Sequence, residues 1–174
     1  MFPASPFATP SERHEEPMMT GKREYPDRPM VGVGGVVISD GRALLIRRGS
    51  EPLKGEWSIP GGTLEVGETL VEGIARELRE ETGLEVKVLE LIEVFERIFE
   101  AEPGRPALPG RAARPQYHFV ILDYLCEAVS GEPRPGGDVT DLAFVREAEL
   151  GRYNLTPAAT RVLRKAFAMA RAAK

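Results

Sequence analysis

Hydrophobic residues recur along the chain at two spacings, which predict the segments that are strands and those that are helices. Runs rich in β-branched and other apolar residues, typical of strands, lie at residues 30–39, 42–48, 85–99, 117–129 and 141–145. Asp40 and Gly41, between the first two runs, are typical of a tight turn. We therefore expect the first two runs to form neighbouring strands of a sheet.

After residue 68 the spacing becomes helical. The apolar stripe consists of Leu70, Ile74 and Leu78, which recur every four residues. Thr69 and Glu72 match a capping box, in which the threonine side chain accepts from a free backbone N–H and the glutamate reaches back to the cap. Gly83 can end the helix in a left-handed conformation. The sequence therefore predicts a helix that begins at Thr69 and stops at Gly83.

A second helix is predicted near the end of the sequence. Thr156 and Pro157 are a favourable N-cap and first helical residue. The apolar face of this helix consists of Ala159, Val162, Leu163, Ala166 and Phe167. Two helices that flank a mixed β-sheet predict the α/β class, as an α/β/α sandwich.

Two segments lack any regular pattern. Residues 1–28 are rich in Pro, Ser, Glu and Arg, and we interpret them as a flexible N-terminal arm before a domain at 29–174. Residues 100–115 contain four prolines and three arginines, which predicts a long hairpin loop. The arginines considered there for contact with substrate or a partner subunit are Arg105, Arg111 and Arg114. A solvated loop without such a role is the alternative.

The composition is that of one small globular domain. With 174 residues, 42% of them hydrophobic, the chain can bury one core. A net charge of −4 argues against a nucleic-acid polymer as partner, because proteins that bind such polymers usually carry a basic surface. Cys126 is the single cysteine, which excludes an internal disulfide. No stretch resembles a membrane helix or a signal peptide, so we expect a cytoplasmic protein without membrane contact.

Three carboxylates on the first predicted helix lie close together. Glu77, Glu80 and Glu81 are spaced i, i+3 and i+4, so all three project from one face and repel each other. A hard divalent cation such as Mg²⁺ would offset this repulsion, because it prefers carboxylate oxygens, water and phosphate as ligands. The alternative is a solvated acidic face beside Arg76 and Arg79.

The acidic cluster is part of a longer pattern. Five residues separate Gly62 from Glu68, seven more lead to Arg-Glu-Leu at 76–78, and Glu-Glu at 80–81 and Gly-Leu at 83–84 complete it. This pattern resembles the Nudix box at each of its defined positions. The Nudix fold is an α/β/α sandwich with a mixed sheet, which agrees with the elements predicted above.

The resemblance implies a pyrophosphohydrolase, in which water attacks a phosphorus of the diphosphate bridge. The metal ligands that it implies for Mg²⁺ or Mn²⁺ are Glu77, Glu80, Glu81 and the loop at Gly61. Arg76 is expected to pair with neighbouring glutamates and to fix their rotamers. Glu68 is expected to support the loop or to contact the metal. Simple attraction of Glu68 to the helix N-terminus is the alternative.

The segment before the box, residues 52–62, looks like the corresponding segment of the ADP-ribose pyrophosphatase-like branch of the family. Gly61 and Gly62 are expected to permit positive φ and close approach of the backbone to metal and diphosphate. Further candidates for substrate binding are Trp57, by stacking, and Arg47 and Arg48, by contact with phosphate. Core packing for the tryptophan and surface charge for the arginines are the alternatives.

The sequence leaves the general base open. In the family this role belongs to a box glutamate or to an acidic residue on a distant loop, and the candidates of the second kind are Asp138 and Asp141. Both also suit ordinary turn and capping chemistry. His118 is interpreted as a packing residue rather than a base.

The predicted function is metal-dependent hydrolysis of a nucleoside diphosphate linked to another moiety. ADP-ribose or a related nucleotide sugar is the expected substrate, with a nucleoside monophosphate and a phosphorylated product. The alternatives are a clean-up hydrolase for oxidised nucleoside triphosphates and a Nudix domain that senses a nucleotide without cleaving it. The branch also implies a homodimer, with residues 25–29 as a candidate arm that crosses between subunits.

Overall fold

The computed structural model describes residues 23–100 and 115–173. Its elements, in chain order, are β1 (Met30–Ser39), β2 (Arg42–Arg48), β3 (Trp57–Ser58), β4 (Gly61–Thr63), α1 (Leu70–Thr82), β5 (Leu84–Phe99), β6 (Tyr117–Gly131), β7 (Val139–Arg146), the 3₁₀ helix η1 (Glu147–Arg152) and α2 (Pro157–Ala172).

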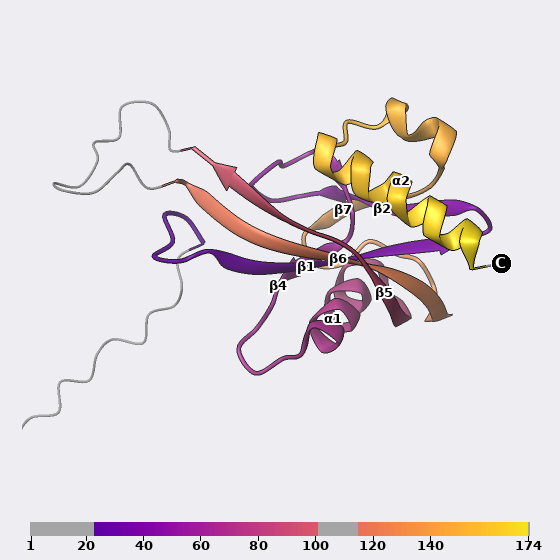
Figure 1. Ribbon diagram of the computed structural model, residues 1–174, viewed down its shortest axis with the longest axis horizontal. Coiled ribbons are helices and arrows are strands. Elements are labelled where there is room, and N and C mark those ends of the chain that lie inside the picture. The colour runs from indigo at the N-terminus through magenta and orange to yellow at the C-terminus, as the bar shows by residue number, and fades with distance from the viewer. Residues whose placement is uncertain (1–22, 101–114, 174) are drawn as a thin grey trace, which may run out of the picture.

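The strands form a mixed sheet, as predicted (Figure 1). Its main order is β3-β2-β1-β6-β5, with β4 also paired to β1 and β7 also paired to β2. Strands β1 and β6 run parallel, with Met30 opposite Phe119 and Val37 opposite Cys126. The other pairs are antiparallel. Strand β1 therefore joins the long β5–β6 hairpin to the strands that precede α1.

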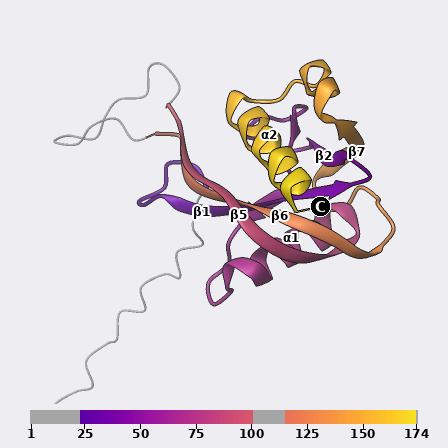
Figure 2. The same ribbon diagram turned by 45° about the vertical axis from the view of Figure 1, so that its right-hand side comes forward.

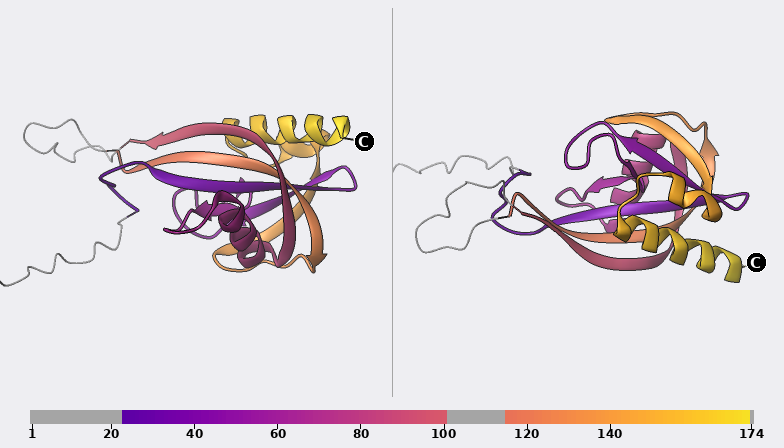
Figure 3. Two further views of the ribbon diagram at one scale, coloured as in Figure 1. Left: turned by 60° about the horizontal axis from the view of Figure 1, so that its bottom comes forward. Right: turned by 90° about the horizontal axis from the view of Figure 1, so that it is seen from above.

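The two helices cover opposite faces of this sheet (Figures 2 and 3). Val36 belongs to the core cluster that includes Val162 and Leu163 of α2. Val37, the next residue along β1, belongs instead to the cluster that includes Ile74 and Leu78 of α1. Because successive side chains of a strand point to opposite faces, β1 supplies both cores. The predicted α/β/α sandwich is confirmed.

The helix ends follow the predicted local chemistry. The Thr69 side chain accepts from the Glu72 backbone N–H, and the Glu72 carboxylate accepts from the Thr69 backbone N–H, which completes the capping box. Gly83 ends α1 with φ of 72°, a left-handed conformation that glycine adopts without strain. Thr156 caps α2 through the Ala159 N–H at 3.2 Å. These local signals were sufficient to place both helices.

Several boundaries differ from the prediction. Strand β7 covers Val139–Arg146 rather than 141–145, because it continues to pair with β2 as far as Arg48. The short strands β3 and β4 were not predicted, since runs of two and three residues show no periodicity. Strands β5 and β6 pair up to Phe99 and Tyr117, so the predicted hairpin is present. Its candidate arginines Arg105, Arg111 and Arg114 lie outside the described residues.

Of the predicted arm, residues 1–22 also lie outside the described residues, and 23–28 run beside the start of β6. The Tyr25 N–H donates to the Gln116 carbonyl at 2.8 Å, and the Tyr117 hydroxyl donates to Glu24 at 2.8 Å. None of the helices in the described ranges combines the length and hydropathy needed to span a membrane.

Candidate active site

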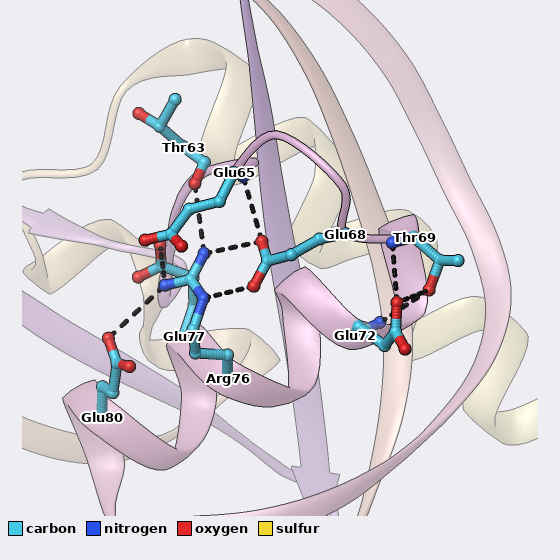
Figure 4. Close-up of polar contacts among 8 residues, drawn as sticks. All are labelled: Thr63, Glu65, Glu68, Thr69, Glu72, Arg76, Glu77 and Glu80. Atoms are coloured by element: carbon cyan, nitrogen blue, oxygen red, sulfur yellow. Dashed lines mark hydrogen bonds and ion pairs between the residues drawn. The ribbon is translucent and has the colours of Figure 1, made fainter. Parts of the chain in front are cut away.

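Arg76 of α1 lies at the centre of a network of carboxylates from this helix and from the loop before it (Figure 4). Its Nε donates to Glu68 Oε1 at 2.6 Å and its Nη2 donates to Glu68 Oε2 at 3.0 Å, so this ion pair is bidentate. Its Nη1 donates to Glu77 at 2.9 Å and to Glu80 at 3.4 Å. Nη2 also donates to the Thr63 carbonyl at 3.2 Å. One rigid guanidinium thus orients three carboxylates and the end of β4.

Glu68 lies in the loop between β4 and α1 and is held from two sides. Besides the two bonds from Arg76, its Oε2 accepts from the Glu65 backbone N–H at 3.0 Å. The hydrogen bond from Arg76 and then that from Glu65 lower the pKa of Glu68 to about 2. The contacts of Glu68 are therefore those of a residue that supports the loop.

Glu81 is the most deeply buried of the three box glutamates. The residue is 7% exposed, and its Oε2 accepts from the Gly61 backbone N–H at 2.8 Å. Burial raises the pKa of Glu81 to about 8, and the nearby charges of Glu77 and Asp138 add to this effect. A carboxyl group in this position binds a proton readily, or gains from a cation that replaces the proton.

Glu77 lies against the backbone of Gly62. A Cβ atom at position 62 would collide with the Glu77 carboxylate, so glycine is needed there for close approach. Burial raises the pKa of Glu77, with opposition from Arg76. Its side chain is 13% exposed, whereas that of Glu80 is 53% exposed. The three glutamates share one side of the helix, but their surroundings differ strongly.

The two loop glycines have different roles. Gly61 has φ of 151°, inside the range that favours glycine, whereas a positive φ is absent at Gly62. The expectation of positive φ was therefore correct for Gly61 and wrong for Gly62, where space for Glu77 is the requirement. Together they let β4 approach the carboxylates of α1.

The carboxylates of this site fit a hard divalent cation by their chemistry. Glu77 and Glu81 both line a cavity, and burial makes ionisation costly for both. Across the described ranges, no three Asp, Glu, His or Cys side chains converge closely enough to form a metal site as they stand. The Arg76 guanidinium bridges Glu77 and Glu80 and occupies one carboxylate oxygen of each. The oxygens that suit a cation are therefore the other oxygen of Glu77, the other oxygen of Glu80 and those of Glu81, which Arg76 does not contact.

The cavity beside these glutamates has a volume of about 440 Å³. Gly61 and Gly62 form part of its wall. Aromatic side chains, contributed by β5 and β6, make up part of its wall, and they are Phe95, Phe99 and Phe119. Residues of the first turn of α2 also line it. A ligand that fills the cavity would therefore meet carboxylates and apolar rings.

The predicted substrate-binding side chains divide into two groups. Arg48 lines the cavity, and its Nε donates to the Pro52 carbonyl at 2.9 Å. Arg47 is exposed, does not line the cavity, and donates to the Gly55 carbonyl at 3.1 Å. Trp57 is also absent from the cavity wall and packs edge-to-face on Tyr153, with ring centroids 5.1 Å apart. The geometry therefore favours Arg48 for ligand contact and core packing for the tryptophan.

The structure also distinguishes the two candidate general bases by their surroundings. Asp138 lines the cavity and accepts a hydrogen bond from the Ser50 hydroxyl. Asp141 is exposed, does not line the cavity, and accepts from the Leu142 backbone N–H at 2.9 Å. Only the first of these carboxylates lies where a substrate in the cavity can meet it.

Four charged residues of the cavity wall were missed in the sequence, and they are Arg23, Glu51, Arg97 and Asp123. Arg23 lies in the segment interpreted as a flexible arm, and Arg97 in a strand of alternating pattern. Asp123 lies within the apolar run of β6 and is 3% exposed, and burial raises its pKa to about 7. A single acidic residue inside the run 119–126, which is otherwise apolar or aromatic, was the available signal for Asp123.

Comparisons with known proteins agree with this geometry. A family model of the NUDIX domain matches residues 28–166. The chain is 34% identical to an ADP-ribose pyrophosphatase of Methanocaldococcus jannaschii, over 67% of this chain and 61% of that protein. It is 49% identical to a MutT-like protein of Streptomyces ambofaciens, over 76% of this chain and 74% of that protein.

A solved relative has the same fold. The crystal structure of a MutT NUDIX hydrolase from Burkholderia pseudomallei matches with a TM-score of 0.66 and 31% identity, and it covers 80% of this chain and 98% of that one. The family model spans the box residues, and the solved structure has the same fold as this chain. The chain belongs to the NUDIX hydrolase family.

Proposed function

We propose that this protein hydrolyses a nucleoside diphosphate linked to a second moiety, with ADP-ribose or a related nucleotide sugar as substrate. The observation that carries the proposal is the position of Glu81. This carboxyl group is buried beside Glu77, bound to the Gly61 N–H, and open to a cavity large enough for part of a nucleotide. The ADP-ribose pyrophosphatase similar to this chain supports the choice of substrate.

The proposed cofactor is Mg²⁺ or Mn²⁺, held by Glu77 and Glu81 with Glu80 at the rim. When bound, such an ion neutralises phosphate charge and lowers the pKa of a coordinated water. The chain itself would fix the geometry. The Gly61 N–H orients Glu81, and the Arg76 guanidinium orients Glu77 and Glu80.

Two other residues of the cavity receive roles in the proposal. The Arg48 guanidinium, which already lies in the wall, would bind a phosphate oxygen. Asp138 would accept the proton of the attacking water, because it lies in the same wall and Asp141 does not. The Ser50 hydroxyl that bonds Asp138 would hold the carboxylate in position.

A substrate panel tests the proposed reaction. The purified protein is given ADP-ribose, NADH, several nucleotide sugars, a dinucleoside polyphosphate and 8-oxo-dGTP, each with Mg²⁺ and with Mn²⁺. Products are identified by mass. AMP and ribose 5-phosphate from ADP-ribose are the expected result. Preferred cleavage of 8-oxo-dGTP would reassign the substrate, and stabilisation by ligands without any turnover would favour a sensor.

The homodimer and the cytoplasmic location remain part of the proposal. Sedimentation of the full chain tests the first. Fractionation of cells that express it tests the second.

A further inference from the structure

Asp123 presents a buried carboxyl group to the cavity and has no bonding partner. The residue is 3% exposed, and none of the described residues forms a hydrogen bond or an ion pair with its side chain. No fully enclosed side-chain oxygen or nitrogen in the described ranges lacks a partner. The small exposed area of Asp123 therefore reaches its carboxyl oxygens, which open into the cavity.

The neighbouring strands leave this carboxyl group free rather than neutralised. A Cβ atom at Gly34, its partner on β1, would collide with Asp123 Oδ1, so glycine makes the room that the carboxyl group occupies. Its partner on β5 is Glu93, a second acid, which binds Arg161 at 2.7 Å and Lys165 at 2.6 Å. Burial of a carboxyl group without a hydrogen-bond donor destabilises the folded protein, and a ligand that supplies the donor would offset this cost.

The position of Asp123 relative to the box suits a ligand that spans both. Gly34 pairs with Gly61 on its other side, so two strand spacings, about 10 Å, separate Asp123 from the loop that binds Glu81. A nucleotide can bridge such a span from its phosphate to the far edge of its base. Phe95, Phe119 and Ile121 in the same wall would contact the face of a planar ring.

We propose that Asp123 is a specificity-determining residue that accepts a hydrogen bond from an N–H group of the substrate's nucleobase. This inference rests on the proposed function, since it names the part of the nucleotide that enters the cavity. It adds a polar contact, remote from the box, that selects bases by their donors. A site that hydrogen-bonds a donor rejects the analogue that lacks it, because its own buried group is then left unpaired.

Binding of monophosphates tests the proposal without any turnover. The probes are AMP, GMP, purine riboside 5′-monophosphate, which has neither an exocyclic amine nor a ring N–H on its base, and ribose 5-phosphate. Each is titrated calorimetrically in Mg²⁺ into the full chain and into Asp123→Leu and Asp123→Asn. The matched control is Ile121→Leu, which alters the same wall without a polar group. Thermal unfolding checks that each variant is folded.

We expect Asp123→Leu to weaken AMP and GMP by about tenfold or more, as for a lost bond to a buried acidic group. Purine riboside 5′-monophosphate and ribose 5-phosphate should change by less than about threefold on the same energy scale. Asp123→Asn should weaken GMP more than AMP. The amide has one accepting oxygen and one donating NH₂ group, which match the acceptor and the donor of the adenine edge. The guanine edge offers two donors, and the amide can accept from only one of them through its oxygen. Ile121→Leu should shift the three nucleotide probes together, whatever donors their bases carry, and should leave ribose 5-phosphate unchanged.

Several results would overturn the inference. Equal weakening of all four probes would show that Asp123 acts structurally or on the ribose that they share, and not on the base. Absence of AMP and GMP binding to the unaltered chain would also contradict it. Failure of the proposed function is separate: base-selective binding without any hydrolysis in the substrate panel would reject the reaction and retain the role of Asp123.

Discussion

The Gly61 backbone N–H donates to the Glu81 carboxylate at 2.8 Å, which joins the start of β4 to the last turn of α1. The two residues are 20 positions apart, and their contact places a buried carboxyl group in the wall of the cavity. Gly61 can make this approach because its φ of 151° is open to glycine. The geometry of the candidate site depends on this contact and on the Arg76 network beside it.

Replacement of Arg76 by lysine should impair the site while its charge is kept. Lysine has no planar fork, so it cannot bond both oxygens of Glu68 and also reach Glu77. We expect a 10- to 100-fold loss of kcat or of apparent Mg²⁺ affinity, roughly the range for residues that orient metal ligands. Metal titration of the turnover rate measures it.

The control for this variant is Arg79→Lys, on the exposed side of the same helix. It should behave as the unaltered chain. Equal activity of Arg76→Lys and Arg79→Lys would remove Arg76 from the organisation of the site.

Gly62→Ala should reduce turnover through steric displacement of Glu77. The new methyl group would occupy the place of the Glu77 carboxylate, which must then turn away from the cavity. We expect a fall in kcat of about tenfold or more, as for a misplaced catalytic group. Gly151→Ala is the matched control, because a Cβ atom at that position meets no other residue within 4 Å. Comparable kcat values for the two variants would show that Glu77 does not need its present position.

The stability of the protein should reflect the titration of Asp123. Burial, with a smaller effect of Glu93, raises its pKa to about 7 from 3.8. Between these values the unfolded chain has lost the proton and the folded chain retains it, so the free energy of unfolding falls as pH rises from about 4 to about 7. The total fall from this group is at most roughly 4 kcal/mol.

Asp123→Asn removes this titration and isolates its effect. Chemical denaturation at pH 5 and at pH 8 should show the variant gaining stability relative to the unaltered chain as pH rises. Asp40→Asn, at an exposed turn, supplies the comparison. Parallel stability curves for Asp123→Asn and the unaltered chain would mean that Asp123 is ionised in the folded state at both pH values.

Local patterns predicted the helices and part of the site, because their determinants lie a few residues apart. Thr69 and Glu72 cap each other across three residues, and Gly83 needs only its own left-handed conformation. The identity of the box residues also follows from spacing along one segment. For this reason the three glutamates and Arg76 were identified together in the sequence.

The rest of the site depends on contacts between distant segments. Trp57 packs on Tyr153, almost a hundred residues later, and this contact withdraws its ring from the cavity wall. Asp123 faces the cavity because β6 pairs in parallel with β1, a register that no local pattern encodes. Asp138 lies just before β7 and lines the cavity, whereas Asp141 lies within β7, opposite Arg47, and does not line it.

The most direct test of the proposed reaction is the rate of ADP-ribose hydrolysis at saturating Mg²⁺ for the unaltered chain and for Glu81→Gln. Glu85→Gln, an exposed residue just beyond α1, serves as the control. Glutamine has the same shape but no charge, so kcat should fall by orders of magnitude, with unfolding and Glu85→Gln activity unchanged. A Glu81→Gln variant that retains full kcat would contradict the account.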